Sequence, residues 1–438
     1  MGSRVRRAVC VAAYVLAFLA PVLIMVVAPR PAARQFWRDA AVAIGFLGFA
    51  LMGVQFVPTG RIPFLTDIFA LDVLYKVHHK LSRIAFFLVL AHPIVLLLQN
   101  PNNFVAFNLL SAPWKLRSGP VAFLLLLGLI VTSIWRQWLR MSYEAWRVVH
   151  NILSVGVVGF SLYHIFKVDY YTSSPLQRWL WIVYGVICGG MILYIRVIKP
   201  LLLLRKPFRV VEVIAERGKT WSLVVEPDGH KGHDFRAGQV AWISTSGTPF
   251  TFVEHPFSYS SSEGNPARIA FAIRELGDWT NKIGTLKPGD RVYVDGPYGT
   301  FDMEDHPGEG YVFIAGGIGA APVMSMLRTL ADRGDTQPLT FFYGNPTWES
   351  ISFREELETL QERLNLKVVH VLERPPEGWE GETGYISQDV LKRHAPFDLP
   401  NSVYFICGPL PMIRGVMRSL HVLQIPRAHC HAEQFEMA

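Results

Sequence analysis

The 438-residue sequence contains only four cysteines, and no two of them form a C-x-x-C pair. Thiols so few and so scattered exclude a disulfide-stabilised scaffold, a redox dithiol and an iron–sulfur cluster. The absence of C-x-x-C-H also excludes covalently attached haem. The sequence has no P-loop, catalytic-triad motif or EF-hand loop, which argues against an NTPase, a hydrolase and direct calcium control.

Charged residues are also scarce, at 18% of the chain against 51% hydrophobic residues. This composition excludes intrinsic disorder and is too apolar for a single soluble enzyme. The net charge of +7 does not indicate nucleic-acid binding, because Lys and Arg cluster where hydrophobic segments end and form no basic stripe. Such clustering is typical of a membrane topology signal.

Hydrophobic runs of about twenty residues, the length of a membrane-spanning helix, fill the chain up to residue 205. The first run exceeds the hydrophobic region of a typical signal peptide, which is the alternative, and is interpreted as a retained helix. From Lys206 onward no segment is long and apolar enough to span. The predicted spans are Ala8–Ala28, Ala40–Val57, Val73–Leu98, Pro120–Trp138, Tyr143–Phe166 and Trp179–Ile198.

Basic residues near the helix ends predict an orientation with the N-terminus on the inner side of the membrane. The inner flanks then hold more Lys and Arg than the outer flanks, for example Lys76, Lys80, Arg136 and Arg196. Because the number of helices is even, the polar second half of the chain is also expected in the cytoplasm.

Four histidines are placed in matching positions on two predicted helices: His78 and His92 on the third, His150 and His164 on the fifth. Both pairs are spaced by fourteen residues, so each pair lies on one helix face, about 21 Å apart along the axis. Ionisable residues at membrane depth are costly and usually functional. The two helices together predict two stacked sites of two imidazoles each, the ligand set of a b-type haem.

These histidines have other interpretations. They can make structural hydrogen bonds, relay protons or line a path for metal ions. His79, the neighbouring residue, is an alternative to His78, although its spacing of thirteen residues from His92 is about 140° from whole turns. Equal spacing on both helices favours His78.

Short β-rich runs separated by Gly, Pro and Asp turns follow from about residue 208 to residue 302 and predict a small antiparallel β-barrel. One segment in it has an aromatic ring flanked by hydroxyls, which can lie along a flavin, although Ser-rich turns are common. That segment is His255-Pro256-Phe257-Ser258-Tyr259-Ser260-Ser261.

A second candidate element follows a predicted strand that ends near Arg274. Residues Gly277, Asp278, Trp279 and Thr280 open a predicted helix, which together with Arg274 supplies backbone amides and a cation for a diphosphate. The alternative is a capped helix beside a surface arginine.

After Asp302 strands and helices alternate, which predicts a doubly wound parallel sheet. The strand at 311–315 runs into a turn of small residues, Gly316 to Pro322, that lets a phosphate approach a helix N-terminus. The turn departs from G-x-G-x-x-G, and such a turn can also bind nothing. Cys407 at the end of another strand can neighbour a nicotinamide or be a buried structural thiol.

Taken in order, these motifs resemble the ferredoxin–NADP reductase superfamily, including Asp-Gly-Pro-Tyr-Gly at Asp295–Gly299 and Cys-Gly-Pro-x-x-Met from Cys407. The membrane half resembles the ferric-reductase-like transmembrane domain of NADPH oxidases and ferric reductases. The fusion resembles a bacterial NADPH-oxidase-like flavocytochrome b. It implies a six-helix domain with two b-type haems at 1–205, an FAD-binding β-barrel at 206–302 and an NAD(P)-binding α/β domain at 303–438.

The resemblance also implies residue roles. His78, His92, His150 and His164 would ligate haem iron. Phe257, Ser258, Cys407 and Phe435 would stand at the site of hydride transfer, where Phe435 resembles a terminal ring that covers the flavin and must be displaced. Residues implied to bind FAD are His255, Pro256, Phe257, Ser258, Ser260, Ser261, Arg274, Gly277, Trp279, Thr280 and Phe435. Those implied to bind the nicotinamide dinucleotide are Gly316, Gly317, Gly319, Pro322, Cys407, Gly408 and Pro409.

Two positions depart from the family pattern. Pro346 stands about where many NADP-selective relatives place an arginine for the 2′-phosphate, which leaves NADPH and NADH both open. Leu96 stands one helical turn beyond His92, where some animal oxidases carry another histidine. This second departure weakens the case for superoxide production.

The predicted function is transmembrane electron transfer from cytosolic NAD(P)H, through FAD and two haems, to an acceptor outside the inner (plasma) membrane. Oxygen is the favoured acceptor, giving superoxide; the alternatives are a ferric chelate and a periplasmic or membrane protein. A non-enzyme alternative is a histidine-lined metal transporter with a nucleotide-binding domain. The expected partners are membrane lipid and the small-molecule acceptor, without nucleic acid, and the sequence does not indicate a protein partner.

Overall fold

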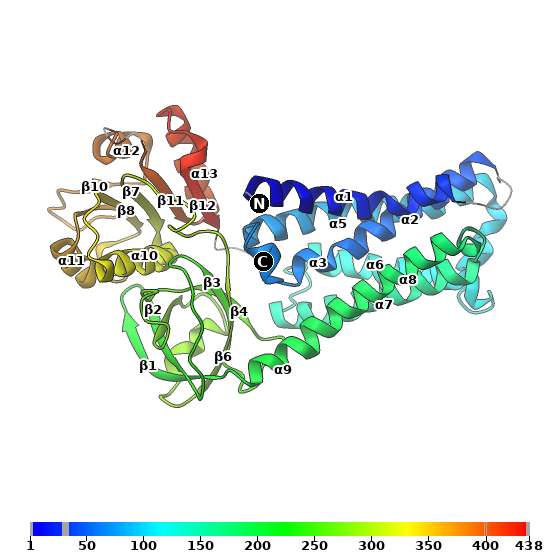
Figure 1. Ribbon diagram of the computed structural model, residues 1–438, viewed down its shortest axis with the longest axis horizontal. Coiled ribbons are helices and arrows are strands. Elements are labelled where there is room, and N and C mark those ends of the chain that lie inside the picture. Colours follow the sequence, from blue (N-terminus) through cyan, green and yellow to red (C-terminus); the bar gives the residue numbers. More distant parts are fainter. Residues whose placement is uncertain (1–2, 29–34, 398, 400, 435–438) are drawn as a thin grey trace. The chain divides into compact units, whose positions relative to one another are not determined.

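The computed structural model describes residues 3–28, 35–397, 399 and 401–434 (Figure 1). The chain forms two compact units. The first consists of Met1–Ile68 and Val73–Lys199, and the second of Phe69–Asp72 and Pro200–Ala438.

The first unit is helical, and within the described residues six helices are long and apolar enough to cross a membrane. They are α1 (Ser3–Val27), α2 (Phe36–Val54), α5 (Leu71–Gln99), α6 (Trp114–Ile134), α7 (Tyr143–Val168) and α8 (Pro175–Leu193). The last continues through a π-helical turn, Tyr194–Ile198, into α9 (Lys199–Leu204). Short helices α3 (Phe56–Thr59) and α4 (Pro63–Thr66) follow α2.

Five of the six helices begin before their predicted starts, and only the start at Tyr143 agrees. The fourth span begins at Trp114, so Pro120 lies inside α6, and the sixth begins at Pro175. Proline fits the first turn of a helix, where its missing N–H is not needed, which accounts for Pro175. Within membrane helices proline is tolerated when neighbouring helices cover the freed backbone, and Pro120 is buried.

Aromatic packing joins α2 to α8 in the first unit. The fully buried Trp181 of α8 contacts Phe46 and Phe49 of α2, with ring centroids 5.0 and 5.4 Å away. Tyr184, one turn along α8, packs on the same indole. Large buried rings of this kind contribute strongly to helix packing.

The second unit begins with a six-stranded antiparallel sheet in the order β4-β3-β6-β1-β2-β5. An isolated bridge pairs Tyr259, directly after β4, with Phe271 of β5, so the two outer strands meet at one point. The sequence predicted a β-barrel in this region. The structure shows an open strand order whose two outer strands, β4 and β5, are joined by this one bridge. The strands are β1 (Phe208–Glu216), β2 (Thr220–Pro227), β3 (Val240–Ser244), β4 (His255–Ser258), β5 (Ile269–Arg274) and β6 (Arg291–Tyr298).

A six-stranded parallel sheet follows, in the order β10-β9-β8-β7-β11-β12. Its strands are β7 (Tyr311–Gly316), β8 (Leu339–Asn345), β9 (Leu366–Leu372), β10 (Glu382–Thr383), β11 (Val403–Gly408) and β12 (Cys430–Gln434). Helices α10 (Ala320–Arg333) and α11 (Arg354–Arg363) pack on one face, and α12 (Gln388–His394) and α13 (Leu410–Val422) on the other (Figure 1). This is the doubly wound arrangement expected from alternating strands and helices.

Candidate functional site

In the helical unit, α5 brings His78 opposite His150 of α7, with ring centroids 6.4 Å apart. Metal–imidazole bonds are about 2 Å long, so rings on opposite sides of one ion have centres about 6 Å apart. The observed separation therefore suits a single metal ion between the two rings. His79 is exposed on α5, and its ring centroid is 6.0 Å from that of His78. The geometry favours His78 over His79.

A hydroxyl orients His150. The Ser133 hydroxyl donates to the carbonyl of Leu129 at 2.7 Å, so its lone pairs accept from the indole N–H of Trp146 and from Nδ1 of His150, each at 3.3 Å. This places the ring proton of His150 on Nδ1 and leaves Nε2 with a lone pair. Nε2 is then the atom that can bind a metal.

The second pair is His92 of α5 with His164 of α7, which lie close enough to interact electrostatically. Nδ1 of His92 is 2.8 Å from the backbone oxygen of Ala41 in α2. A carbonyl only accepts, so Nδ1 carries the proton and Nε2 is again left as a potential ligand. In the described residues no group of three or more His, Cys, Asp or Glu is arranged for a metal ion. Within the described residues, the candidate metal ligands of the helical unit are therefore these two pairs of histidines.

In the second unit, β4 carries the predicted flavin segment. The ring of Phe257 is stacked on Trp279 with centroids 5.5 Å apart and planes inclined by 18°. The hydroxyls of Ser258 and Ser260 are buried and make no hydrogen bond within the described chain. Buried hydroxyls of this kind are normally satisfied, so they suit a polar ligand. The hydroxyl of Ser261 is already used, since it accepts from the backbone N–H of Ala270.

Arg274 connects the two sheets of this unit. It ends β5, and a Cβ placed on Gly317, after β7, would lie only 3.0 Å from its Nη1. The cation thus stands at the glycine turn of the parallel sheet. The predicted helix beyond Arg274 is a 3₁₀ helix, Thr280–Thr285. Its Thr280 hydroxyl accepts from the backbone N–H groups of Leu276 and Gly277, so this side chain holds the turn.

The carboxyl ends of β7 and β11 approach each other closely at the predicted dinucleotide turn. A Cβ on Gly319 would overlap the carbonyl oxygen of Cys407, and one on Gly408 would lie 3.1 Å from the Gly316 nitrogen. Helix α10 starts at Ala320 with Pro322 buried in its first turn. The small residues at this edge are therefore required by close backbone packing between the ends of β7 and β11.

The sequence missed Glu433, which lies beside Cys407. The two are register partners in β12 and β11, and both are buried. Burial raises the pKa of Glu433 to about 8 and that of the Cys407 thiol well above its usual value. Pro409 precedes α13 as its N-cap. Phe435 lies outside the described residues; its nearness in sequence to Glu433 is the signal that could have drawn attention to that carboxyl group.

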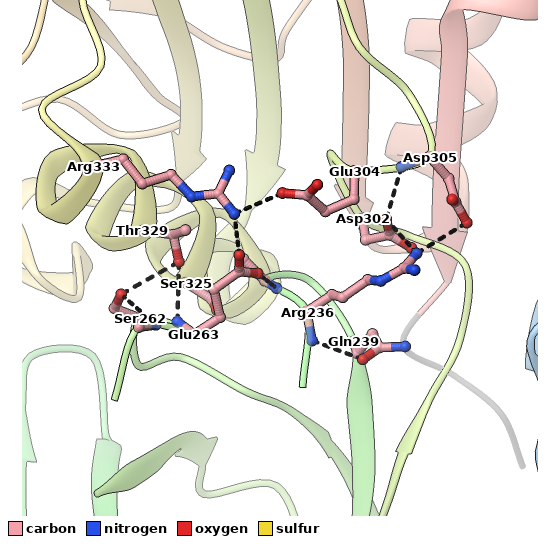
Figure 2. A network of polar contacts seen from close by, with 12 residues as sticks. Arg236, Gln239, Ser262, Glu263, Asp302, Glu304, Asp305, Ser325, Thr329 and Arg333 are labelled. Atoms are coloured by element: carbon pink, nitrogen blue, oxygen red, sulfur yellow. Dashed lines mark hydrogen bonds and ion pairs between the residues drawn. The ribbon is translucent and has the colours of Figure 1, made fainter. Parts of the chain in front are cut away.

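Polar contacts fix α10 to the segment after the flavin motif (Figure 2). Ser325 donates to the carbonyl of Ser261 at 2.6 Å, and the Thr329 hydroxyl accepts from the Glu263 N–H at 3.1 Å. Glu263 also accepts from the Ala237 N–H and pairs with Arg333. The helix that starts at the glycine turn is therefore tied to the strand segment that carries the buried hydroxyls.

The chain matches two family profiles. The profile described as ferric reductase like transmembrane component covers residues 44–161, and the one described as oxidoreductase NAD-binding domain covers residues 313–418. The first profile includes His78, His92 and His150 but ends before His164, and the second includes the glycine turn and most of the parallel sheet.

Individual proteins resemble part of this chain. The gamma subunit of sulfhydrogenase 2 from Pyrococcus furiosus is 34% identical over 230 residues, which are 48% of this chain and 77% of that subunit. NADH-cytochrome b5 reductase 1 from Kluyveromyces lactis is 32% identical over 176 residues, 40% of this chain and 63% of the reductase. The chain thus spans less than two thirds of the length of this yeast relative. Among solved structures, the cytochrome b5 reductase domain of Ulva prolifera nitrate reductase matches with a TM-score of 0.45 and 20% identity, over 52% of this chain and 96% of that one.

Fold and site together define an oxidoreductase with an NAD-binding domain. The chain belongs to the same family as this sulfhydrogenase gamma subunit. It also matches a ferric-reductase-like transmembrane component and is a multi-pass membrane protein.

Proposed function

We propose that this protein moves electrons from NAD(P)H across a membrane to an acceptor on the far side, through FAD and two bis-histidine haems. The observation that carries the proposal is the facing of His78 and His150 at 6.4 Å, on helices matched by the ferric-reductase profile. The same chain carries a dinucleotide-binding module. A chain with both parts is suited to take electrons from a soluble donor into the membrane.

The residues at the flavin segment fit FAD. Phe257 and Trp279 offer stacked rings, and the unsatisfied hydroxyls of Ser258 and Ser260 offer hydrogen bonds to a polar ring edge. Arg274 would neutralise diphosphate charge at the point where Gly317 lies against it. Bound FAD would supply the conversion of two-electron into one-electron transfer. The chain's task is to hold the nicotinamide ring near Cys407 and the flavin near Phe257, with α10 fixing the distance between them.

The four histidines fit two haems. His78 with His150 would hold one, and His92 with His164 the other. The hydrogen bonds to Nδ1 leave Nε2 available on His92 and on His150. Haem supplies a one-electron relay. With two imidazoles on each iron no coordination position is open, so the acceptor would react at the haem edge.

Orientation and acceptor are part of the proposal. We place the N-terminus and the reductase module in the cytoplasm, which makes His78–His150 the inner pair and His92–His164 the outer pair. Oxygen reduced to superoxide is our first choice of acceptor. The match to a ferric-reductase-like component supports a ferric chelate as the second. The histidine-lined transporter loses support, because both matched families are oxidoreductase components.

The test uses the full-length protein in detergent, reconstituted with FAD and reduced anaerobically by NADH or NADPH. We expect split Soret and α bands of low-spin haem to appear on reduction. Admission of oxygen should reoxidise the haems and give superoxide that superoxide dismutase removes. Sluggish reoxidation by oxygen but rapid reoxidation by a ferric chelate would reassign the acceptor. Haem-replete expression that yields protein without haem would refute the proposed function.

A further inference from the structure

Helix α2 carries no histidine, yet its backbone touches His92 at two points one helical turn apart. Nδ1 of His92 is 2.8 Å from the oxygen of Ala41. A Cβ added to Gly45 would lie 2.8 Å from that same Nδ1 and 2.9 Å from Cγ. The imidazole therefore lies directly on the backbone of α2.

These two contacts depend on each other. In an α-helix the carbonyl of residue 41 points toward the N–H of residue 45, so the side chain at position 45 flanks that oxygen. Any side chain there would stand between the imidazole and the carbonyl. Glycine is otherwise unfavourable within a helix, which makes its presence at this point informative.

His164 is packed in the same way on another helix. A Cβ on Gly119 of α6 would lie 3.0 Å from Cε1 and 3.1 Å from Nδ1 of His164. In the described part of the chain, a Cβ added to any glycine has no atom of His78 or His150 among its three nearest neighbours. His150 instead approaches the Ser133 hydroxyl at the longer distance of 3.3 Å. The two pairs are thus held by different means.

We propose that Gly45 and Gly119 are positioning residues for the outer haem site, and that Gly45 acts by giving His92 access to the Ala41 carbonyl. The inference rests on the proposed function. The hydrogen bond keeps the proton of His92 on Nδ1, directs Nε2 toward the iron and makes the imidazole a stronger electron donor. A stronger donor stabilises the oxidised iron, so loss of the bond raises the reduction potential of this haem alone.

The variants are Gly45→Ala and Gly119→Ala, compared with Gly159→Ala in α7. Gly159 is the matched control, because a Cβ there meets no atom within 4 Å, although it lies on the same helix as His164. Each full-length variant is purified with FAD. The readouts are haem-to-FAD stoichiometry, a redox titration and the low-spin haem signals in electron paramagnetic resonance.

We expect Gly45→Ala to shift or remove one of two haem signals, and to raise the midpoint potential of that haem where it is retained. The other haem should keep its wild-type signal, and Gly159→Ala should match wild type throughout. If the wild-type protein holds two haems and the Gly45→Ala variant gives unchanged haem signals, the inference is overturned while the proposed function stands. Equal loss of both haems in Gly45→Ala would also overturn the inference, because such a loss indicates general destabilisation of the helical unit. Wild-type protein without haem overturns the proposed function as well.

Discussion

Pro346 is the residue at which the choice between the two nicotinamide dinucleotides can be tested. It directly follows β8, at the carboxyl edge of the parallel sheet, and its carbonyl accepts from the Arg374 N–H at 2.9 Å. In doubly wound folds this edge binds the dinucleotide. Pro346 itself offers the 2′-phosphate of NADPH neither a cation nor an N–H donor.

We expect Pro346→Arg to tighten NADPH binding by roughly tenfold, because a charge-assisted hydrogen bond to phosphate contributes about 1.5–3 kcal/mol. NADH binding should change little. The measurement is the dissociation constant of each nucleotide from stopped-flow reduction of the flavin. Pro346→Ala removes the ring without adding a cation and serves as the control; a gain shared by NADH, or by the Ala variant, would contradict the prediction.

Glu433 carries a pH dependence of its own. Burial raises its pKa from 4.5 to about 8, so the folded protein keeps a proton that the unfolded chain loses above pH 4.5. The contribution of the protonated Glu433 to the free energy of unfolding is therefore complete below pH 4.5 and is lost as the pH rises toward 8. The glutamine of Glu433→Gln cannot ionise and should remove this dependence.

The measurement is the thermal midpoint of FAD release from the full-length protein between pH 5 and pH 8.5. In the wild type the midpoint should fall across this range, by an amount equivalent to a few kcal/mol at most. In Glu433→Gln it should fall less. Glu358→Gln, at an exposed position on α11, should keep the wild-type slope. Parallel curves for all three proteins would show that Glu433 titrates normally.

At the scale of elements, α10 links the two sheets of the second unit. Glu263 accepts the Ala237 N–H at 2.6 Å and pairs with Arg333 at the end of α10. Arg333 also pairs with Glu304 at 2.6 Å (Figure 2). Because Glu263 bonds to a backbone N–H and a guanidinium together, it holds the loop and the helix end in one arrangement.

We predict that Glu263→Gln weakens this link by about 1–3 kcal/mol, the cost of impairing a charged hydrogen bond. The thermal midpoint of FAD release should drop by several degrees. Flavin reduction by NADH should slow, because the nicotinamide and flavin rings would be held less firmly relative to each other. Glu358→Gln is again the comparison. A variant that loses stability but reduces its flavin at the wild-type rate would show that the link does not serve hydride transfer.

Element types followed from sequence wherever periodicity was strong. The fourteen-residue spacing on α5 and α7 depends only on the helix period, so the alignment of His78 with His92 and of His150 with His164 could be predicted. For the segment from His255 to Ser261 a Ser-rich turn was the alternative from sequence, and the structure makes His255–Ser258 strand β4. Strand β12 is short and polar, and its pairing with β11 is parallel and non-local.

Contacts through a third element could not be predicted either. Nothing in the sequence near His92 indicates that Ala41 and Gly45, some fifty positions earlier, would receive its ring. The neighbouring positions of Cys407 and Glu433 likewise depend on the sheet order. Local pattern gave the elements and their faces, whereas the positioning of the functional side chains depended on packing between elements distant in the chain.

At the scale of the whole molecule, the proposed reaction is a one-way movement of charge across a membrane. An electron that crosses fully against a potential of 100 mV requires about 2.3 kcal/mol. In a sealed vesicle the first turnovers build such a potential, so the reaction should slow itself unless another ion moves in compensation.

Full-length protein in liposomes with equal potassium concentrations inside and outside, and with a membrane-impermeant ferric chelate trapped inside, tests this directly. NADH added outside reaches only molecules whose reductase module faces outward. We expect reduction of the trapped chelate to be slow, because the inward movement of electrons makes the lumen negative. It should accelerate severalfold when valinomycin lets potassium flow in and dissipates the potential. Liposomes holding the Gly159→Ala variant should behave alike, since that substitution meets no neighbouring atom. Fast reduction that valinomycin does not change, in vesicles shown to be sealed, would mean that electron transfer is not electrogenic. In a parallel assay with the chelate supplied only outside, rapid reduction there without reduction of trapped chelate would mean that electrons leave on the side where they enter.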